Sequence, residues 1–298
     1  MPDCHHFLLN SPALNDFDLI LLQEPCINNL GLTRASSRHY VAYPHPHASD
    51  RSKPARAVTF INKALDTNSW EKLPFPSLDV SAVLMKGDFG RLTIFNIYND
   101  CNNSETLHLI RSFIHDHADY ILPDDRSYLL WAGDFNRHHP DWDDLTSHHL
   151  FTPDNTRDAE ILLTLASDHD MEMALPPNIP TLQHISTGRW SRPDNVWISS
   201  SLRDAVTLCN TDPANRGFSD HLPICTTIDI PIDVYDPPPT RNARLADWDK
   251  IRSYITEQLE KEEIPEEIGT QEELTAIVDK ITQIVQDACK AHIPLAKA

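Results

Sequence analysis

The sequence has few glycines, few cysteines and no long hydrophobic run. Its 7 glycines and 23 prolines, the latter mostly single, favour short stiff connections over a low-complexity tract. Its 6 cysteines form no C-x-x-C pair, which disfavours a zinc site of the common kind and favours free thiols. No apolar run approaches the roughly 20 residues that cross a bilayer, and the N-terminus lacks the pattern of a signal peptide. We therefore expect an intracellular protein.

Positive charge is also scarce. The chain has 25 Lys and Arg against 44 Asp and Glu, a formal net charge of -19, which argues against a broad basic surface for nucleic acids. Nucleic acid stays possible as a substrate, because an acidic cluster can bind a phosphate through a metal ion. The signatures of phosphate-loop nucleotidases, serine hydrolases and zinc peptidases are missing as well.

The chain up to residue 236 alternates short apolar runs with loops and two helical stretches. Because the runs have strand length, they predict buried strands. The runs span residues 18–23, 40–43, 57–61, 80–85, 92–98, 128–132, 196–199 and 224–230. Helical spacing predicts helices over 105–120, with Ser104 as N-cap, and over 157–169. We expect an α/β domain over residues 1–236.

The pattern of apolar and polar residues changes after Pro237-Pro238-Pro239. Amphipathic segments over 245–262 and 272–291 predict two helices, and Thr270-Gln271-Glu272-Glu273 is a capping box. Residues 237–298 are thus expected to form a proline-rich linker and a helical appendage, either structural or partner-binding.

Three short motifs each lie at one end of a strand-like run. They are Gln23-Glu24, Gly133-Asp134-Phe135-Asn136 and Ser219-Asp220-His221. Side chains at strand ends can converge on one rim of a sheet. Glu24, Asp134 and Asp220 can then supply carboxylates to Mg²⁺ or Mn²⁺, which prefer oxygen ligands. Asn136 can bind a phosphate oxygen or orient water, and His221 can donate to a phosphate.

These motifs, in this order, resemble those of the endonuclease/exonuclease/phosphatase superfamily. The stretch Arg137-His138-His139-Pro140-Asp141-Trp142 and the segments Arg192-Pro193-Asp194-Asn195-Val196 and Leu222-Pro223-Ile224 are similar to the endonuclease domain of non-LTR (LINE-type) retrotransposons. The resemblance covers about residues 12–232. It implies a four-layer α/β sandwich, in which two packed mixed β-sheets are flanked by helices.

The resemblance also implies roles for single residues. Glu24 resembles a metal-binding glutamate, and Tyr98 a tyrosine that contacts the phosphate. Asp134 resembles the aspartate that positions or deprotonates the attacking water, with Asn136 as its partner. Asp194 resembles the aspartate that orients the catalytic histidine, and Asp220 and His221 the closing pair.

Substrate contacts are predicted more weakly. Arg137, His138, Arg189 and Arg192 lie near these motifs and are candidates for contact with DNA phosphates, with a solvated loop as the alternative.

One departure from the family pattern concerns the N-terminus. The family begins with a strand that carries an asparagine, but only 23 residues precede Glu24, and Leu8 to Asn15 predict the tail of a helix. The first strand is therefore expected to be missing, which leaves an open sheet edge.

The leading hypothesis is a Mg²⁺-dependent DNA endonuclease that nicks one strand and leaves a 3′-hydroxyl. It would act in the nucleus on genomic DNA, and in a complete element beside a reverse transcriptase domain. Two alternatives stay open: a phosphatase for a small phosphoester, and an inactive remnant that acts as a binding module. The oligomeric state is open.

Overall fold

The computed structural model describes residues 7–232, 241–262, 265 and 269–295. The chain divides into two compact units, Met1–Tyr235 and Asp236–Ala298, here called the N-terminal and C-terminal units. The predicted linker motif Pro237–Pro239 lies outside the described residues.

Among the described residues, the N-terminal unit contains all the strands and, besides the helical residues 7–10, three α-helices with described bounds. The strands are β1 (Leu19–Gln23), β2 (His39–Ala42), β3 (Ala57–Asn62), β4 (Trp70–Lys72), β5 (Val80–Gly87), β6 (Gly90–Tyr98), β7 (Ser127–Asp134), β8 (Met171–Met173), β9 (Leu182–Gln183), β10 (Trp190–Ser191), β11 (Asp194–Ser199), β12 (Val206–Thr211) and β13 (Ile224–Ile228). The helices are α2 (Glu105–Asp116), α3 (Ala118–Ile121) and α4 (Pro153–Asp168).

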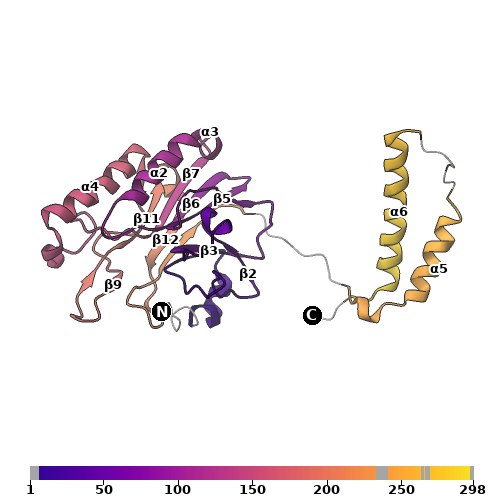
Figure 1. The fold of residues 1–298 in the computed structure, drawn as a ribbon, viewed down its shortest axis with the longest axis horizontal. Coiled ribbons are helices and arrows are strands. Elements are labelled where there is room, and N and C mark those ends of the chain that lie inside the picture. Colours follow the sequence, from indigo (N-terminus) through magenta and orange to yellow (C-terminus); the bar gives the residue numbers. More distant parts are fainter. Residues whose placement is uncertain (1–6, 233–240, 263–264, 266–268, 296–298) are drawn as a thin grey trace. The chain divides into compact units, whose positions relative to one another are not determined.

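A six-stranded mixed sheet forms the centre of this unit. Its order is β4-β5-β6-β7-β11-β8, with β6 and β7 parallel and the other neighbours antiparallel. Successive side chains of a strand point to opposite faces. Phe95 and Trp131 accordingly point to the face that packs against α2 and α4, where Phe113 and Leu162 meet them. Figure 1 shows α2, α3 and α4 along this side of the sheet, away from β2 and β3.

The opposite face of the central sheet packs against a second β-layer. This layer consists of the sheet β1-β3-β2 and the pair β12-β13. Ile61 of β3, Leu130 of β7 and Ile198 of β11 are buried in the apolar core between the layers, and Leu21 and Ile224 line it. The predicted α/β sandwich is confirmed. Among the described strands, β1 pairs only with β3, and β13 only with β12.

A chain of side-chain amides also links the two layers. Gln23 Nε2 donates to Asn96 Oδ1 at 2.6 Å, and Asn96 Nδ2 donates to the Val58 carbonyl at 2.8 Å. Asn96 is fully buried. A buried amide without a hydrogen-bond partner lowers the stability of the fold. These amide hydrogen bonds therefore fix the end of β1, and with it Glu24, against the central sheet.

All eight predicted strands and both predicted helices of the N-terminal unit are present, with shifted ends. The first helix ends at Asp116, and α3 follows His117 as a separate turn. Ser104 is the N-cap residue of α2, as predicted, but its side chain makes no capping hydrogen bond. The Ser104 hydroxyl instead accepts a hydrogen bond from Arg137 Nη2. The short strands β4, β8, β9 and β10 and the more exposed β12 were not predicted. Four of these, β4, β8, β9 and β10, have only two or three residues, too few for a periodic pattern.

The C-terminal unit is a pair of helices, α5 (Trp248–Leu259) and α6 (Gln271–His292). The predicted capping box is confirmed: Glu273 N donates to Thr270 Oγ1, and the Glu273 carboxylate accepts from Thr270 N. Ile251, Ala288 and Ile293 form the small buried core between the helices. Across both units, none of the described helices combines the length and apolarity that a membrane crossing requires.

Gly133 is a position where the fold demands glycine. Its φ is 143°, and an added Cβ would lie 2.0 Å from the Ile97 carbonyl oxygen of the neighbouring strand. We expect Gly133→Ala to lower the free energy of unfolding by about 3 kcal/mol or more, since both the backbone and the strand must move. Urea denaturation measures the loss. Gly188→Ala is the control, because Gly188 has a φ of 68° but open space around its Cβ, so about 1 kcal/mol is expected there. Equal losses would contradict the steric explanation.

Candidate active site

The candidate site lies where β7 ends and β11 begins. Asp134 is the last residue of β7 and Asp194 the first of β11, and the two are directly paired in the antiparallel register. His221 comes from the loop before β13 and is held by an isolated bridge to Leu182. A carboxylate oxygen of each aspartate and a ring nitrogen of His221 all lie within 4.8 Å of one another. The structure thus brings together three residues that the sequence places far apart.

Asp194 orients His221. Its Oδ2 lies 2.8 Å from His221 Nδ1 and also accepts a 2.7 Å hydrogen bond from Thr181 Oγ1. Burial lowers the pKa of His221, but the hydrogen bond to Asp194 and the charges of Asp194, Asp134 and Asp220 outweigh burial and raise the pKa to about 9. His221 is therefore protonated at neutral pH, with Nε2 directed away from Asp194 as a free donor.

Asp134 is buried, and its carboxyl has a raised pKa. Burial raises the pKa of Asp134 to about 7, with a further contribution from the charge of Asp194. Its Oδ1 accepts from the Asn136 backbone N–H at 3.0 Å, and Asn136 Nδ2 donates to the Asn99 carbonyl at 2.9 Å. A carboxyl that titrates near neutral pH, beside an amide held in place, suits proton transfer to or from water.

Glu24 and Tyr98 form a second part of the site. Glu24 follows β1 directly, is exposed, and is close enough to Asp134 to raise the pKa of that carboxyl. Burial raises the pKa of Tyr98 to about 12, and a hydrogen bond to Glu24 adds to it. The Arg56 guanidinium lies over the Tyr98 ring, 4.0 Å from its centre. Tyr98 therefore keeps its proton and remains a hydrogen-bond donor.

The backbone is strained at two of these positions. Glu24 and Asn136 have φ values of 47° and 50°, in the left-handed region that residues other than glycine rarely adopt. Asn tolerates this conformation well, but Glu does not. Such strain is concentrated at functional sites, where the surrounding structure imposes it.

The carboxylate of Asp220 is not part of the close group. Among the described residues, Asp134, Asp194 and His221 are the one set of acidic, His or Cys side chains with mutually close ligand atoms. The recorded hydrogen bonds of Asp220 are through its backbone carbonyl, which accepts from Gln183 N and Arg216 Nη2. The predicted metal trio of Glu24, Asp134 and Asp220 is thus not gathered as such in this structure.

Two of the predicted phosphate contacts are buried. Arg137 donates to the carbonyls of Asp100, Asn103 and Asn136, and burial lowers its pKa. Arg192 is 1% exposed and donates to Asn195 Oδ1 and to backbone carbonyls. Burial lowers the pKa of Arg192 to about 10. Both guanidinium groups are buried and donate hydrogen bonds to the protein itself. They therefore position loops and do not face a substrate, contrary to the prediction.

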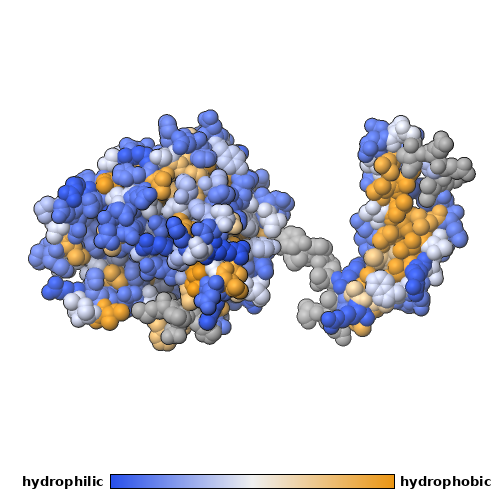
Figure 2. Space-filling view, in the orientation of Figure 1, coloured by the Kyte–Doolittle hydropathy of each residue, from blue (hydrophilic) through white to orange (hydrophobic). Residues whose placement is uncertain are grey.

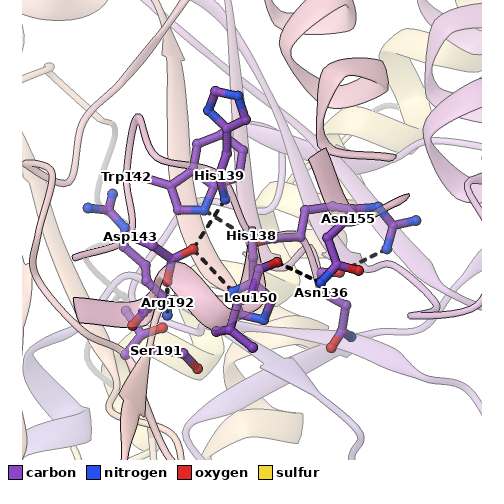
Figure 3. Close-up of polar contacts among 12 residues, drawn as sticks. Asn136, His138, His139, Trp142, Asp143, Leu150, Asn155, Ser191 and Arg192 are labelled. Atoms are coloured by element: carbon purple, nitrogen blue, oxygen red, sulfur yellow. Dashed lines mark hydrogen bonds and ion pairs between the residues drawn. The ribbon is translucent and has the colours of Figure 1, made fainter. Parts of the chain in front are cut away.

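His138 also forms a hydrogen bond within the protein, whereas Arg189 is exposed. Asp143 is completely buried and accepts from His138 Nδ1, from the His139 backbone and from the Arg192 backbone, as Figure 3 shows. The His138-His139 segment is therefore anchored to the Arg192 segment just before Asp194. Arg189 lies on the exposed loop between β9 and β10 and lines a pocket of about 720 Å³.

Some residues that support the site lie in no sequence pattern that could have predicted them. Thr181 binds Asp194 but lies in an irregular segment with no motif around it. Asn99 is buried and donates to the Phe135 carbonyl at 2.9 Å, while its own carbonyl holds Asn136. Arg56, which covers Tyr98, also forms ion pairs with Asp79 and Asp100. Each acts through long-range contacts that local patterns do not reveal.

The donor set fits a hard divalent cation. The pKa of Asp134 is raised first by burial and then by the charge of Asp194, and a nearby cation would oppose both effects by favouring the ionised carboxylates. Carboxylates are the ligands that Mg²⁺ and Mn²⁺ prefer, usually together with water and phosphate. Asp194 is less available, because Oδ2 already binds Thr181 and His221. Asp134 and the exposed Glu24 are therefore the better ligands.

Comparisons with known proteins agree with this fold. Residues 92–225 match the family described as endonuclease-reverse transcriptase. The endonuclease domain of TRAS1, a telomere-specific non-LTR retrotransposon, is 15% identical, with a TM-score of 0.58 over 77% of this chain and 94% of that one. No match was found among curated protein sequences.

Two further solved structures are similar to about the same degree. AP endonuclease LMAP from Leishmania major is 16% identical, with a TM-score of 0.58 over 76% of this chain and 85% of that one. The catalytic domain of Xenopus laevis APE2 is 16% identical, with a TM-score of 0.55 over 80% and 91%.

The fold is thus the one found in the solved TRAS1 endonuclease domain and in AP endonuclease LMAP. Within it, the predicted resemblance to the endonucleases of non-LTR retrotransposons is confirmed by the matched family and by the TRAS1 domain.

Replacing Asp194 tests the electrostatics of the site. In Asp194→Asn, we expect the pKa of His221 to fall well below about 9, because its hydrogen-bonded anion is lost. An NMR titration of the imidazole without divalent cations measures it, with the exposed Asp204→Asn as control. A His221 pKa that is unchanged in Asp194→Asn would contradict the assignment.

The same variant should change how stability depends on pH. His221 has a higher pKa in the folded chain than its ordinary 6.5, so its contribution is fully present below 6.5 and is lost as the pH rises through about 9. Between these values, the free energy of unfolding of the wild type should fall with pH more steeply than that of Asp194→Asn. Urea denaturation at several pH values checks this, and equal slopes would contradict it.

Proposed function

We propose that this protein is a divalent-metal-dependent DNA endonuclease that nicks one strand and leaves a 3′-hydroxyl. The observation that carries the proposal is the close group of Asp134, Asp194 and His221, in which a carboxyl that titrates near neutral pH faces a protonated imidazole. Such a pair can accept a proton on one side of a phosphodiester and stabilise negative charge on the other.

In this mechanism the ionised form of Asp134 accepts a proton from the attacking water. The water oxygen bonds to phosphorus, and the bond between phosphorus and the 3′-oxygen breaks. The released 3′-oxygen takes up a proton from solvent water, which leaves a 5′-phosphate and a 3′-hydroxyl. Asn136, whose amide is fixed on the Asn99 carbonyl, keeps a second N–H to orient the water or a phosphate oxygen.

Negative charge grows on the phosphate oxygens during attack. His221, held and kept protonated by Asp194, donates from Nε2 to one of these oxygens. Tyr98 keeps its hydroxyl proton and can donate to another. Glu24 and Asp134 would hold the cation, which supplies electrostatic stabilisation of the same charge when bound. Asp220, adjacent to His221, adds to the charge that keeps His221 protonated.

The hairpin of β9 and β10 is the best placed element for DNA contacts outside the reacting phosphate. It stands beside His221, because Leu182 of β9 forms a bridge with that residue. Its exposed end carries Arg189 and the partly exposed Trp190, and the Arg216 guanidinium lies 5.6 Å from the centre of the Trp190 ring. Arg189 can reach a backbone phosphate, as predicted from the sequence. The overall charge of -19 limits binding elsewhere on the surface.

The biological setting follows from the matched family. In a complete retroelement, the free 3′-hydroxyl would prime a reverse transcriptase domain of the same polyprotein, and the reaction would take place on nuclear DNA. The family description, endonuclease-reverse transcriptase, supports this pairing.

Plasmid nicking tests the activity. Purified protein with Mg²⁺ should convert supercoiled plasmid to the open circular form, and Asp134→Ala and His221→Gln should each lower the rate by roughly 100-fold or more. Chelation should abolish nicking. Extension of the nick by a DNA polymerase, without prior phosphatase treatment, identifies the 3′-hydroxyl.

Asp204→Asn is the matched control, since it removes one carboxylate from an exposed position away from the site. Hydrolysis of small phosphoesters alone would instead identify a phosphatase. No turnover of either substrate, or nicking that survives in Asp134→Ala, would overturn the proposal.

Glu24→Gln tests the metal assignment. We expect this variant to need a clearly higher Mg²⁺ concentration for half-maximal nicking, roughly 10-fold or more, because a neutral amide binds the cation more weakly than a carboxylate. The Mg²⁺ dependence of the nicking rate measures it. The same Mg²⁺ dependence with a reduced maximal rate would show that Glu24 acts in another way, for example by positioning Tyr98.

A further inference from the structure

The C-terminal unit leaves most of its apolar side chains uncovered. Among its described residues only Ile251, Ala288 and Ile293 are buried apolar side chains. Leu274, Val278, Ile281 and Val285 of α6 are 38% to 51% exposed. Figure 2 shows the hydrophobic band along this helix pair. An apolar surface of this kind on a helix pair indicates an interaction site.

The exposed residues of α6 form one continuous stripe. Their spacing is four, three and four residues, which places them on one side of a helix with 3.6 residues per turn. This is the spacing of the seam between packed helices in coiled coils and bundles. Trp248 of α5, which is 54% exposed, adds an apolar side chain from the other helix.

On the side away from buried Ala288, the border of this stripe carries no charge. Thr275, Thr282 and Gln286 follow its free side, whereas Asp279 and Lys290 lie on the far side of the helix by the same helical geometry. The neutral border matters in a chain with a net charge of -19, because like charges beside the seam would repel an identical chain. The stripe is therefore electrostatically compatible with a second copy of itself.

We propose that two copies of this chain associate through the α6 stripes and form a four-helix arrangement from two α5–α6 pairs. A two-helix unit provides half of the apolar faces of a four-helix bundle, and an identical unit related by a two-fold axis provides the other half. The partner is thus a second copy of this chain, and the association brings two nuclease units into one particle.

The test measures the mass of the full chain over a range of concentrations, by light scattering after size-exclusion chromatography and by sedimentation velocity. The wild type should change from monomer to dimer with increasing concentration. Val278→Glu should raise the dimer dissociation constant roughly 10-fold or more, because each copy would place a carboxylate in the apolar seam. Val278 is already exposed in the single chain, so the variant should keep its helix content by circular dichroism.

Ala276→Glu is the matched control. It adds the same charge to an exposed position of α6 on the far side from the stripe, and it should leave the dimer unchanged. A wild type that stays monomeric at all concentrations would overturn the proposal and leave the stripe to another protein or to the N-terminal unit. A dimer that Val278→Glu does not weaken would overturn it too, since another surface would then hold the copies together. Plasmid nicking does not enter either readout.

Discussion

Two buried aspartates on directly paired residues of adjacent strands dominate this structure. The register of β7 and β11 brings Asp134 and Asp194 to the same level, where cross-strand side chains are about 5 Å apart. Two ionised carboxylates at this distance in a buried place repel each other, and the fold accommodates them through the imidazolium of His221 and a proton on Asp134. A divalent cation would replace that proton. The negative charge of the two carboxylates thus exceeds the positive charge of His221, and a cation would balance it.

Much of the remaining structure holds this unfavourable arrangement in place. Gly133 lets β7 pass close to Ile97, and the amides of Gln23 and Asn96 tie the end of β1 to the central sheet. The left-handed conformations of Glu24 and Asn136 are imposed by these surroundings. The free-energy cost of this local strain is small compared with the stabilisation that the two packed layers gain from burying apolar surface.

The sequence predicted the fold and the positions of the main strands, but not their bounds, because long apolar runs and motifs are local signals. It predicted that Asp134 and His221 meet from their places at strand ends, but it added Asp194 only through the family resemblance, since the register that joins Asp194 to Asp134 depends on residues far apart. It was wrong about Arg137 and Arg192, because an arginine beside an active-site motif has the same appearance in sequence whether it faces solvent or binds backbone carbonyls. Thr181 and Asn99 had no pattern at all, and only tertiary structure identifies them.

Asp134 and Asp194 are neighbours in the sheet, yet residues 135–193 separate them along the chain. That long excursion includes α4, the pocket near His148 and the β9–β10 hairpin, and it leaves and re-enters the sheet at fixed points. Evolution can therefore lengthen, shorten or exchange parts of the excursion while the ladder between β7 and β11 keeps the reacting groups aligned.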